Sequence, residues 1–317
     1  MEKIELRKVR DFGALFNDGI AFLRINFKSF FGIILLLAGP FIILTGLLSG
    51  YMQSLQSKLV STSLFPNYFR SSAGLLSANF IGTLSIFLLI YLLTTLVTSA
   101  CVCLFFKNYD KATSEELPLD KNSISPHLAS ASWRLFYNMF LLALIIAVGG
   151  GILIGLFALL FMIPVLNILV GIALVVGCII ILPVVLYVTH VANYIIIRDE
   201  VLVTVAIRKA VDHMRGNFWW TWLLMFCVGM ALATISGLFS LPLSILSMAK
   251  IFTRSMGTDS GSDHSIMYLI FGAISLIGQM LIIIPISTTF CVFNFYSHEE
   301  QKEGTGLMSR IDELDTK

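Results

Sequence analysis

Residues 135–197 read LFYNMFLLALIIAVGGGILIGLFALLFMIPVLNILVGIALVVGCIIILPVVLYVTHVANYIII. This stretch contains no Asp, Glu, Lys or Arg, and most of its side chains are apolar. The hydrocarbon core of a bilayer takes about 20 apolar residues per helix. The stretch is therefore long enough for two membrane-spanning helices, and the turn between them is expected around Pro164.

Four further intervals lack charged residues in the same way, and each is long enough for one span: 29–57, 71–106, 216–249 and 264–298. We therefore predict an all-α membrane protein with six transmembrane helices, folded as a single polytopic domain over residues 1–317. The spans are expected near Phe30–Tyr51, Asn79–Phe105, Phe136–Met162, Leu166–Ile197, Trp219–Ser247 and Ile266–Tyr296.

The composition of the chain fits this class. Apolar residues make up 57% of it and charged residues 13%, and the mean hydropathy is +0.89, whereas soluble domains are roughly 45–50% apolar. The net charge of +2 is nearly balanced, so nothing favours a nucleic-acid partner. All 5 cysteines fall inside predicted spans, so we expect no disulfide framework.

The 21 lysines and arginines lie unevenly on the two sides of the predicted spans. Most of them are in the segment 1–28, the loops 107–134 and 198–215, and the tail 298–317. The basic residues on the other side are Lys58, Arg70, Lys250 and Arg254. Because loops that stay in the cytoplasm are enriched in Lys and Arg, both termini are predicted to be cytoplasmic.

The cytoplasmic segment 1–28 is predicted to contain an amphipathic surface helix from Asp11 to Phe27. Its apolar residues recur at helical spacing, as Phe12, Leu15, Phe16, Ile20, Leu23 and Phe27. We expect this helix to lie roughly parallel to the membrane plane, with its apolar side chains turned toward the bundle or the lipid.

The chain also reads as three copies of one unit, each made of a cytoplasmic surface helix, a span out and a span back. Two of the surface helices end alike, as RINF at 24–27 and RGNF at 215–218. The returning spans match as well, because a threonine precedes the basic or histidine residue at each span end by nine positions: Thr98 and Lys107, Thr189 and Arg198, Thr289 and His298. Three parallel repeats imply a pseudo-threefold axis along the membrane normal.

A surface helix that ends in Arg-x-Asn-Phe before a span, repeated over six spans, resembles a broad group of largely uncharacterised bacterial integral membrane proteins. The pattern is similar to the six-span membrane domain that some bacteria fuse to glycerophosphodiester phosphodiesterases. The resemblance covers most of the chain and implies a place in the bacterial cytoplasmic (inner) membrane. No phosphodiesterase domain is recognised in residues 1–317, so neither that activity nor any functional residue carries over.

Candidate binding residues lie near the cytoplasmic ends of the returning spans. Tyr187, His190 and Asn193 share one face of the fourth span. With Thr98 and Thr289 of the second and sixth spans, they could line a polar vestibule for a ligand. The alternative is that His190 and Asn193 hydrogen-bond between helices, while each threonine bonds the carbonyl four residues earlier in its own helix.

The spans offer little reactive chemistry. They contain no Asp or Glu, and we find no metal-ligand spacing, no glycine-rich phosphate loop and no Ser–His–Asp set. We therefore expect neither an enzyme nor a cofactor or metal. Four spans contain a proline that could kink them, namely Pro40, Pro183, Pro242 and Pro285. Small-residue pairs such as Gly46 and Gly50 favour close helix packing.

Two functions are consistent with these features. In the first, the protein is a non-catalytic inner-membrane protein that scaffolds or assists a membrane complex or an envelope process. In the second, it binds or transports a neutral or amphipathic solute, or a lipid, in a cavity between the repeats. The expected partners are membrane lipids and, in the first case, another membrane protein.

Overall fold

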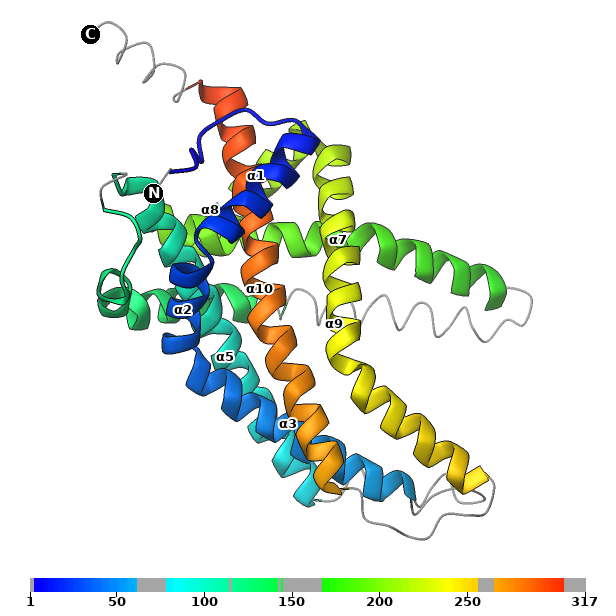
Figure 1. The fold of residues 1–317 in the computed structure, drawn as a ribbon. Helices are drawn as coiled ribbons and strands as arrows, with labels where there is room; N and C mark the ends of the chain where they lie inside the picture. Colours follow the sequence, from blue (N-terminus) through cyan, green and yellow to red (C-terminus); the bar gives the residue numbers. More distant parts are fainter. Residues whose placement is uncertain are drawn as a thin grey trace, which may run out of the picture. The chain divides into compact units, whose positions relative to one another are not determined.

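The computed structural model describes residues 3–61, 78–113, 116–141, 144, 167–255 and 265–304, and these residues form helices and no strands. Figure 1 traces the helices along the chain. They are α1 (Phe12–Ile25), α2 (Phe27–Leu37), α3 (Gly39–Ser61), α5 (Ala78–Lys111), the 3-10 turn η1 (Lys121–Ser123), α7 (Asn167–Asp199), α8 (Val203–Gly216), α9 (Phe218–Ser255) and α10 (Ser265–Glu303). Residues 125–141 are also helical.

Four helical segments are long and apolar enough to cross a membrane: Phe80–Lys111, Gly171–Asp199, Phe218–Lys250 and Ser265–Lys302. They match the predicted second, fourth, fifth and sixth spans. A fifth crossing is added if α1 and α2, which are bent by 68° at Asn26, are counted as one broken span. The described residues are therefore all-helical and include helices long and apolar enough to cross a membrane, while the count of six spans and the threefold repeat stay predictions.

The predicted first span, Phe30–Tyr51, is not one continuous helix. The structure divides it at Ala38, between the end of α2 and the start of α3. Pro40 lies in the first turn of α3, where its missing N–H and fixed φ are tolerated. Most of the predicted third span, Phe136–Met162, lies outside the described residues, which include only 136–141 and 144 of it.

The other three prolines do not break their helices. Pro183 lies inside α7, Pro242 inside α9 and Pro285 inside α10. A proline removes one backbone hydrogen bond from a helix. In membrane helices this loss is tolerated because neighbouring helices and nearby Ser or Thr side chains satisfy the freed carbonyl groups.

The chain divides into two compact units. Unit 1 comprises Met1–Ile33, Ser99–Met230 and Pro285–Lys317, and unit 2 comprises Ile34–Thr98 and Ala231–Ile284. The helices α2, α5, α9 and α10 contribute residues to both.

An aromatic cluster around Phe22 of α1 forms a core in unit 1. The Phe22 ring is fully buried and stacks on Phe106, with 5.0 Å between centroids. Its other ring neighbours are Phe30, Phe105, Tyr109 and Phe293. Aromatic pairs contribute about 0.5–1.5 kcal/mol each beyond the area they bury, so the cluster fastens α1 to α2, α5 and α10.

A helix is present in the predicted segment as α1, while its placement parallel to the membrane plane stays a prediction. It begins after Asp11, whose side chain accepts a hydrogen bond from the Ala14 N–H at 2.7 Å. Leu15, Gly19 and Phe22 of α1 are buried against the protein, whereas Ile20 is 56% exposed. The reason is a close helix contact. A Cβ on Gly19 would lie 2.7 Å from the Phe290 ring, so the absence of a side chain at Gly19 allows α10 to approach α1 closely. Gly19 therefore lies in the middle of the buried face of α1.

Unit 2 is packed through glycines. A Cβ on Gly46 would lie 2.4 Å from Ile277, and one on Gly50 would lie 2.0 Å from the Leu269 carbonyl oxygen. The prediction that Gly46 and Gly50 allow close helix packing is confirmed, because α3 meets α10 at both positions. Thr45 of α3 and Thr94 of α5 add a buried hydroxyl–hydroxyl hydrogen bond of 2.6 Å.

Candidate functional site

The predicted polar face of α7 is buried and forms hydrogen bonds between helices. The two ring nitrogens of His190 lie 2.9 Å from the hydroxyl oxygens of Ser287 and Thr288 on α10. The Asn193 side-chain carbonyl accepts a hydrogen bond from the Asn138 amide, on the helix 125–141. Tyr187 is also fully buried. His190 and Asn193 therefore join α7 to two other helices of unit 1, whereas the Tyr187 hydroxyl has no hydrogen-bond partner among the described residues.

The two predicted threonines bond their own helices. The Thr98 hydroxyl donates to the Thr94 carbonyl and the Thr289 hydroxyl to the Pro285 carbonyl, both at 2.8 Å. Both threonines are fully buried. Thr289 lies in unit 1 beside Thr288, the partner of His190, whereas Thr98 belongs to unit 2. The contacts of His190, Asn193 and the two threonines are therefore those of the alternative, hydrogen bonds within the protein.

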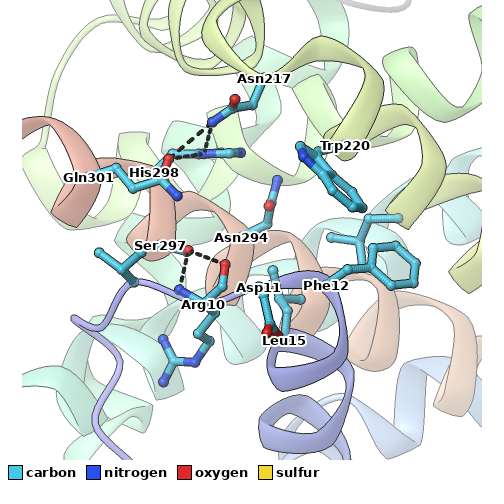
Figure 2. A pocket seen from close by; sticks show the side chains of 12 residues that line it. Arg10, Asp11, Phe12, Leu15, Asn217, Trp220, Asn294, Ser297, His298 and Gln301 are labelled. Atoms are coloured by element: carbon cyan, nitrogen blue, oxygen red, sulfur yellow. Dashed lines mark hydrogen bonds between the residues drawn. The ribbon is translucent and has the colours of Figure 1, made fainter.

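Two pockets lie among the described residues of unit 1, and none of the five predicted site residues lines either of them. The first, of about 310 Å³, lies between the start of α1, the start of α9 and the end of α10 (Figure 2). Its lining is Val9, Arg10, Asp11, Phe12, Leu15, Asn217, Trp220, Leu224, Asn294, Ser297, His298 and Gln301. Basic side chains of α5 and the helix 125–141 line the second pocket.

The polar wall of the first pocket is centred on His298 of α10. Its Nδ1 atom lies 3.0 Å from the Asn217 side-chain amide, and its Nε2 atom lies 3.3 Å from the Thr221 hydroxyl. The same Asn217 amide donates to the Gln301 side-chain carbonyl at 3.0 Å. Figure 2 shows these three labelled side chains, Asn217, His298 and Gln301, turned toward one another. The wall offers donors and acceptors that carry little charge.

The opposite wall of this pocket is aromatic. The Phe12 and Trp220 rings lie 5.7 Å apart between centroids, and Trp220 is 57% exposed. The Arg10 guanidinium points away from His298 (Figure 2) and pairs with Asp18 at 2.8 Å. The Asp11 carboxylate is used as the cap of α1. An aromatic wall facing uncharged polar groups suits a neutral or amphipathic molecule.

Sequence reasoning missed this pocket, although two repeat signals pointed to it. Asn217 belongs to the RGNF motif that ends α8, and His298 is the residue found nine positions after Thr289. Both repeat signals thus mark pocket residues. What brings them together is the packing of α9 on α10, which a single sequence does not specify.

Arg198, at the end of α7, is the centre of an ion-pair network. Its guanidinium makes two 2.8 Å hydrogen bonds to the Glu299 carboxylate and one of 2.7 Å to Asp199. Lys209 of α8 completes the network with a 2.9 Å bond to Asp199. The guanidinium also lies 4.8 Å from the Phe295 ring centroid. Planar, bidentate pairing of this kind is the strongest that a guanidinium makes, so the network fixes α7, α8 and α10 together.

The first residues of the chain are bonded across unit 1. Lys3 donates to the Ala112 carbonyl at 2.7 Å, and the Ile4 N–H donates to the Tyr109 hydroxyl at 2.9 Å. The Arg10 N–H donates to the Ser297 hydroxyl at 2.9 Å, and the Arg10 side chain is fully buried. The amino-terminal segment is therefore tied to the ends of α5 and α10.

No family model matches the chain, and neither a curated protein nor a solved structure shows significant similarity to it. Within the described ranges, no group of three or more His, Cys, Asp or Glu side chains is arranged to hold a metal ion. The 5 cysteines, all of them described, are free.

Proposed function

We propose that this chain is a non-catalytic integral protein of the bacterial inner membrane that scaffolds or assists a membrane complex. Both termini then face the cytoplasm, together with the end of unit 1 that carries the Arg198 network. This orientation agrees with the distribution of Lys and Arg.

One observation carries this proposal: His190 and Asn193, two polar side chains of α7, are bonded to polar side chains of neighbouring helices. His190 uses both ring nitrogens on Ser287 and Thr288, and Asn193 pairs with Asn138. A solute pathway needs polar groups that face a water-filled space, whereas interhelical hydrogen bonds hold a bundle together. The ion-pair network around Arg198 makes the polar end of unit 1 rigid as well, which suits a docking platform.

The test is site-specific photo-crosslinking in membranes, followed by purification in mild detergent. Arg208 is a suitable position, because its side chain is 85% exposed on α8. Ser85, which is exposed on the apolar helix α5, is the matched control that we expect to face lipid. We expect a single protein adduct from Arg208 and none from Ser85. The proposal fails if the chain purifies alone and cells that lack it assemble their membrane complexes normally.

A second function, the binding of a neutral or amphipathic molecule, is favoured by the pocket between α1, α9 and α10. Its uncharged polar wall and the exposed Trp220 ring could hold a lipid headgroup or a similar solute. Native mass spectrometry of the purified chain should then detect a bound molecule that is lost in Trp220→Ala. Trp219→Ala is the control, because Trp219 is 74% exposed and does not line the pocket. Equal retention by both variants would rule this function out.

A further inference from the structure

The second pocket of unit 1 differs from the first in its charge. It has a volume of about 350 Å³ and lies between the end of α5, the helix 125–141 and the end of α7. Its lining is Leu104, Lys107, Asn108, Lys111, His127, Ser130, Ala131, Arg134, Ile197 and Glu200. The volume is at the lower end of the range for small-molecule sites, roughly 300–1,000 Å³.

Two cations in this lining pair with one carboxylate. The Lys107 ammonium lies 3.1 Å from one Glu200 carboxylate oxygen, and the Arg134 guanidinium lies 3.1 Å from the other. These hydrogen bonds, first that of Lys107 and then that of Arg134, lower the pKa of the Glu200 carboxyl below its ordinary value. With Lys111 on the same wall, the lining keeps an excess of positive charge.

The backbone at Glu200 is in the left-handed region, with φ of 57°. At the end of α10 the corresponding conformation, with φ of 61°, is taken by Gly304. A side chain disfavours this region, and glycine is the usual residue where a helix ends in it. At the end of α7 the chain instead has a glutamate whose carboxylate lies between two cations of the pocket.

We propose that this pocket binds a phosphate-class anion, which displaces the Glu200 carboxylate from Lys107 and Arg134 and gains Lys111 as a third partner. Glu200 is suited to leave because its side chain is 55% exposed and belongs to a loop rather than a helix. Lys107 is better fixed, because its ammonium also donates to the Ile197 carbonyl at 2.8 Å and its side chain is only 18% exposed. The hydroxyl of Ser130, which donates to the His127 carbonyl at 3.2 Å, also lines the pocket.

Two sources could supply such an anion, a lipid headgroup and free phosphate. Lys107 and Lys111 are at the end of a helix long and apolar enough to cross a membrane, where headgroups are expected. The same charges would hold a soluble phosphate.

The experiment uses the full chain purified in a nonionic detergent and isothermal titration calorimetry at low ionic strength. The probes are dihexanoyl phosphatidate, inorganic phosphate and, as the neutral comparison, dihexanoyl phosphatidylcholine. Lys111→Gln should weaken phosphatidate binding roughly fivefold, since one basic residue near an anionic surface contributes about that factor. Glu200→Gln should strengthen it several-fold, because the internal competitor is gone. Arg208→Gln removes an equal charge outside the pocket and should change nothing.

The melting temperature of each variant without probe shows whether it is folded, and Lys111→Gln tests the proposal even if Glu200→Gln is unstable. Binding of phosphatidate alone identifies a lipid headgroup as the ligand, whereas equal binding of inorganic phosphate identifies a soluble anion. The proposal is overturned if neither anion binds more tightly than phosphatidylcholine, or if Lys111→Gln binds as the unaltered chain does.

Discussion

The Arg198 side chain pairs with two carboxylates and also lies over an aromatic ring in unit 1. Its guanidinium is 18% exposed and Glu299 is 13% exposed, so the pair is largely shielded from water. Loss of one partner from a shielded pair is costly, because the other charge is left without compensation. This side chain is therefore expected to matter more for stability than the exposed charges of α8.

We predict that Arg198→Gln lowers the free energy of unfolding by about 2–3 kcal/mol, a value reduced from that of a fully buried pair because both side chains keep some exposure. Arg198→Lys should cost less, since it keeps the charge but loses the planar fork. Thermal unfolding in detergent measures both. In the Arg198→Gln background Glu299→Gln should cost less than it does alone, and additive effects would contradict the pairing.

His213 of α8 gives unit 1 a dependence on pH. Its ring lies 4.7 Å from the Phe295 ring, and burial, followed by the charges of Lys302 and Arg198, lowers the pKa of His213 below its ordinary value of about 6.5. Below that pH the unfolded chain binds a proton that the folded chain resists. The contribution of His213 to stability is therefore present at pH 7 and is lost as the pH falls through 6.5 toward the folded pKa.

The measurement is the melting temperature of the purified chain between pH 7.5 and 5, beside that of His213→Gln. We expect the variant to lose less stability over this interval, because it has no proton to gain at this position. Parallel curves for the two proteins would contradict the assignment of His213.

The helices α3 and α10 pack closely in unit 2 at Gly50. Gly50→Ala would place a methyl group 2.0 Å from the Leu269 carbonyl oxygen, which is backbone and cannot rotate away. We predict a loss of about 1–3 kcal/mol, as for other overpacked contacts. Gly229→Ala is the matched control, because nothing lies within 4 Å of its added methyl, and alanine should stabilise the helix there by up to about 1 kcal/mol. Thermal unfolding of the two variants in detergent decides, and equal effects would contradict the contact.

The helices themselves could be predicted from the sequence, because a long stretch without charges can cross a bilayer only as a helix. Their faces could not. In α1 the 3.6-residue period allows either Ile20 or Phe22 to point inward, and the choice is made by Gly19 against Phe290, a contact with the last helix. Polar residues such as His190 could be identified, but whether they bond a neighbour or line a pocket depends on how α7 packs on α10.

For the molecule as a whole, the prediction that is most open to test is its orientation. Cytoplasmic loops are enriched in Lys and Arg. Reporters fused after Lys121 or Lys317 should therefore lie in the cytoplasm, where the fluorescent protein is fluorescent and alkaline phosphatase is inactive. A fusion after Ser262 should register outside. Alkaline phosphatase and fluorescent-protein fusions provide the two opposite readouts. A fusion after Lys121 that registers outside would reverse the assignment of both termini and of the two pockets.

The bonds of the amino-terminal segment also set an order for biogenesis. The Arg10 N–H bonds Ser297, which lies 287 positions later in the chain. At about 5–20 residues per second, the ribosome adds that much chain in roughly 15–60 s. During this time Arg10 has emerged but its partner has not yet been synthesised. In a nascent chain that stops before Ser297, the Arg10 N–H has no Ser297 hydroxyl to bond. A membrane protease could then distinguish truncated copies from finished ones by their unbound amino-terminal segment.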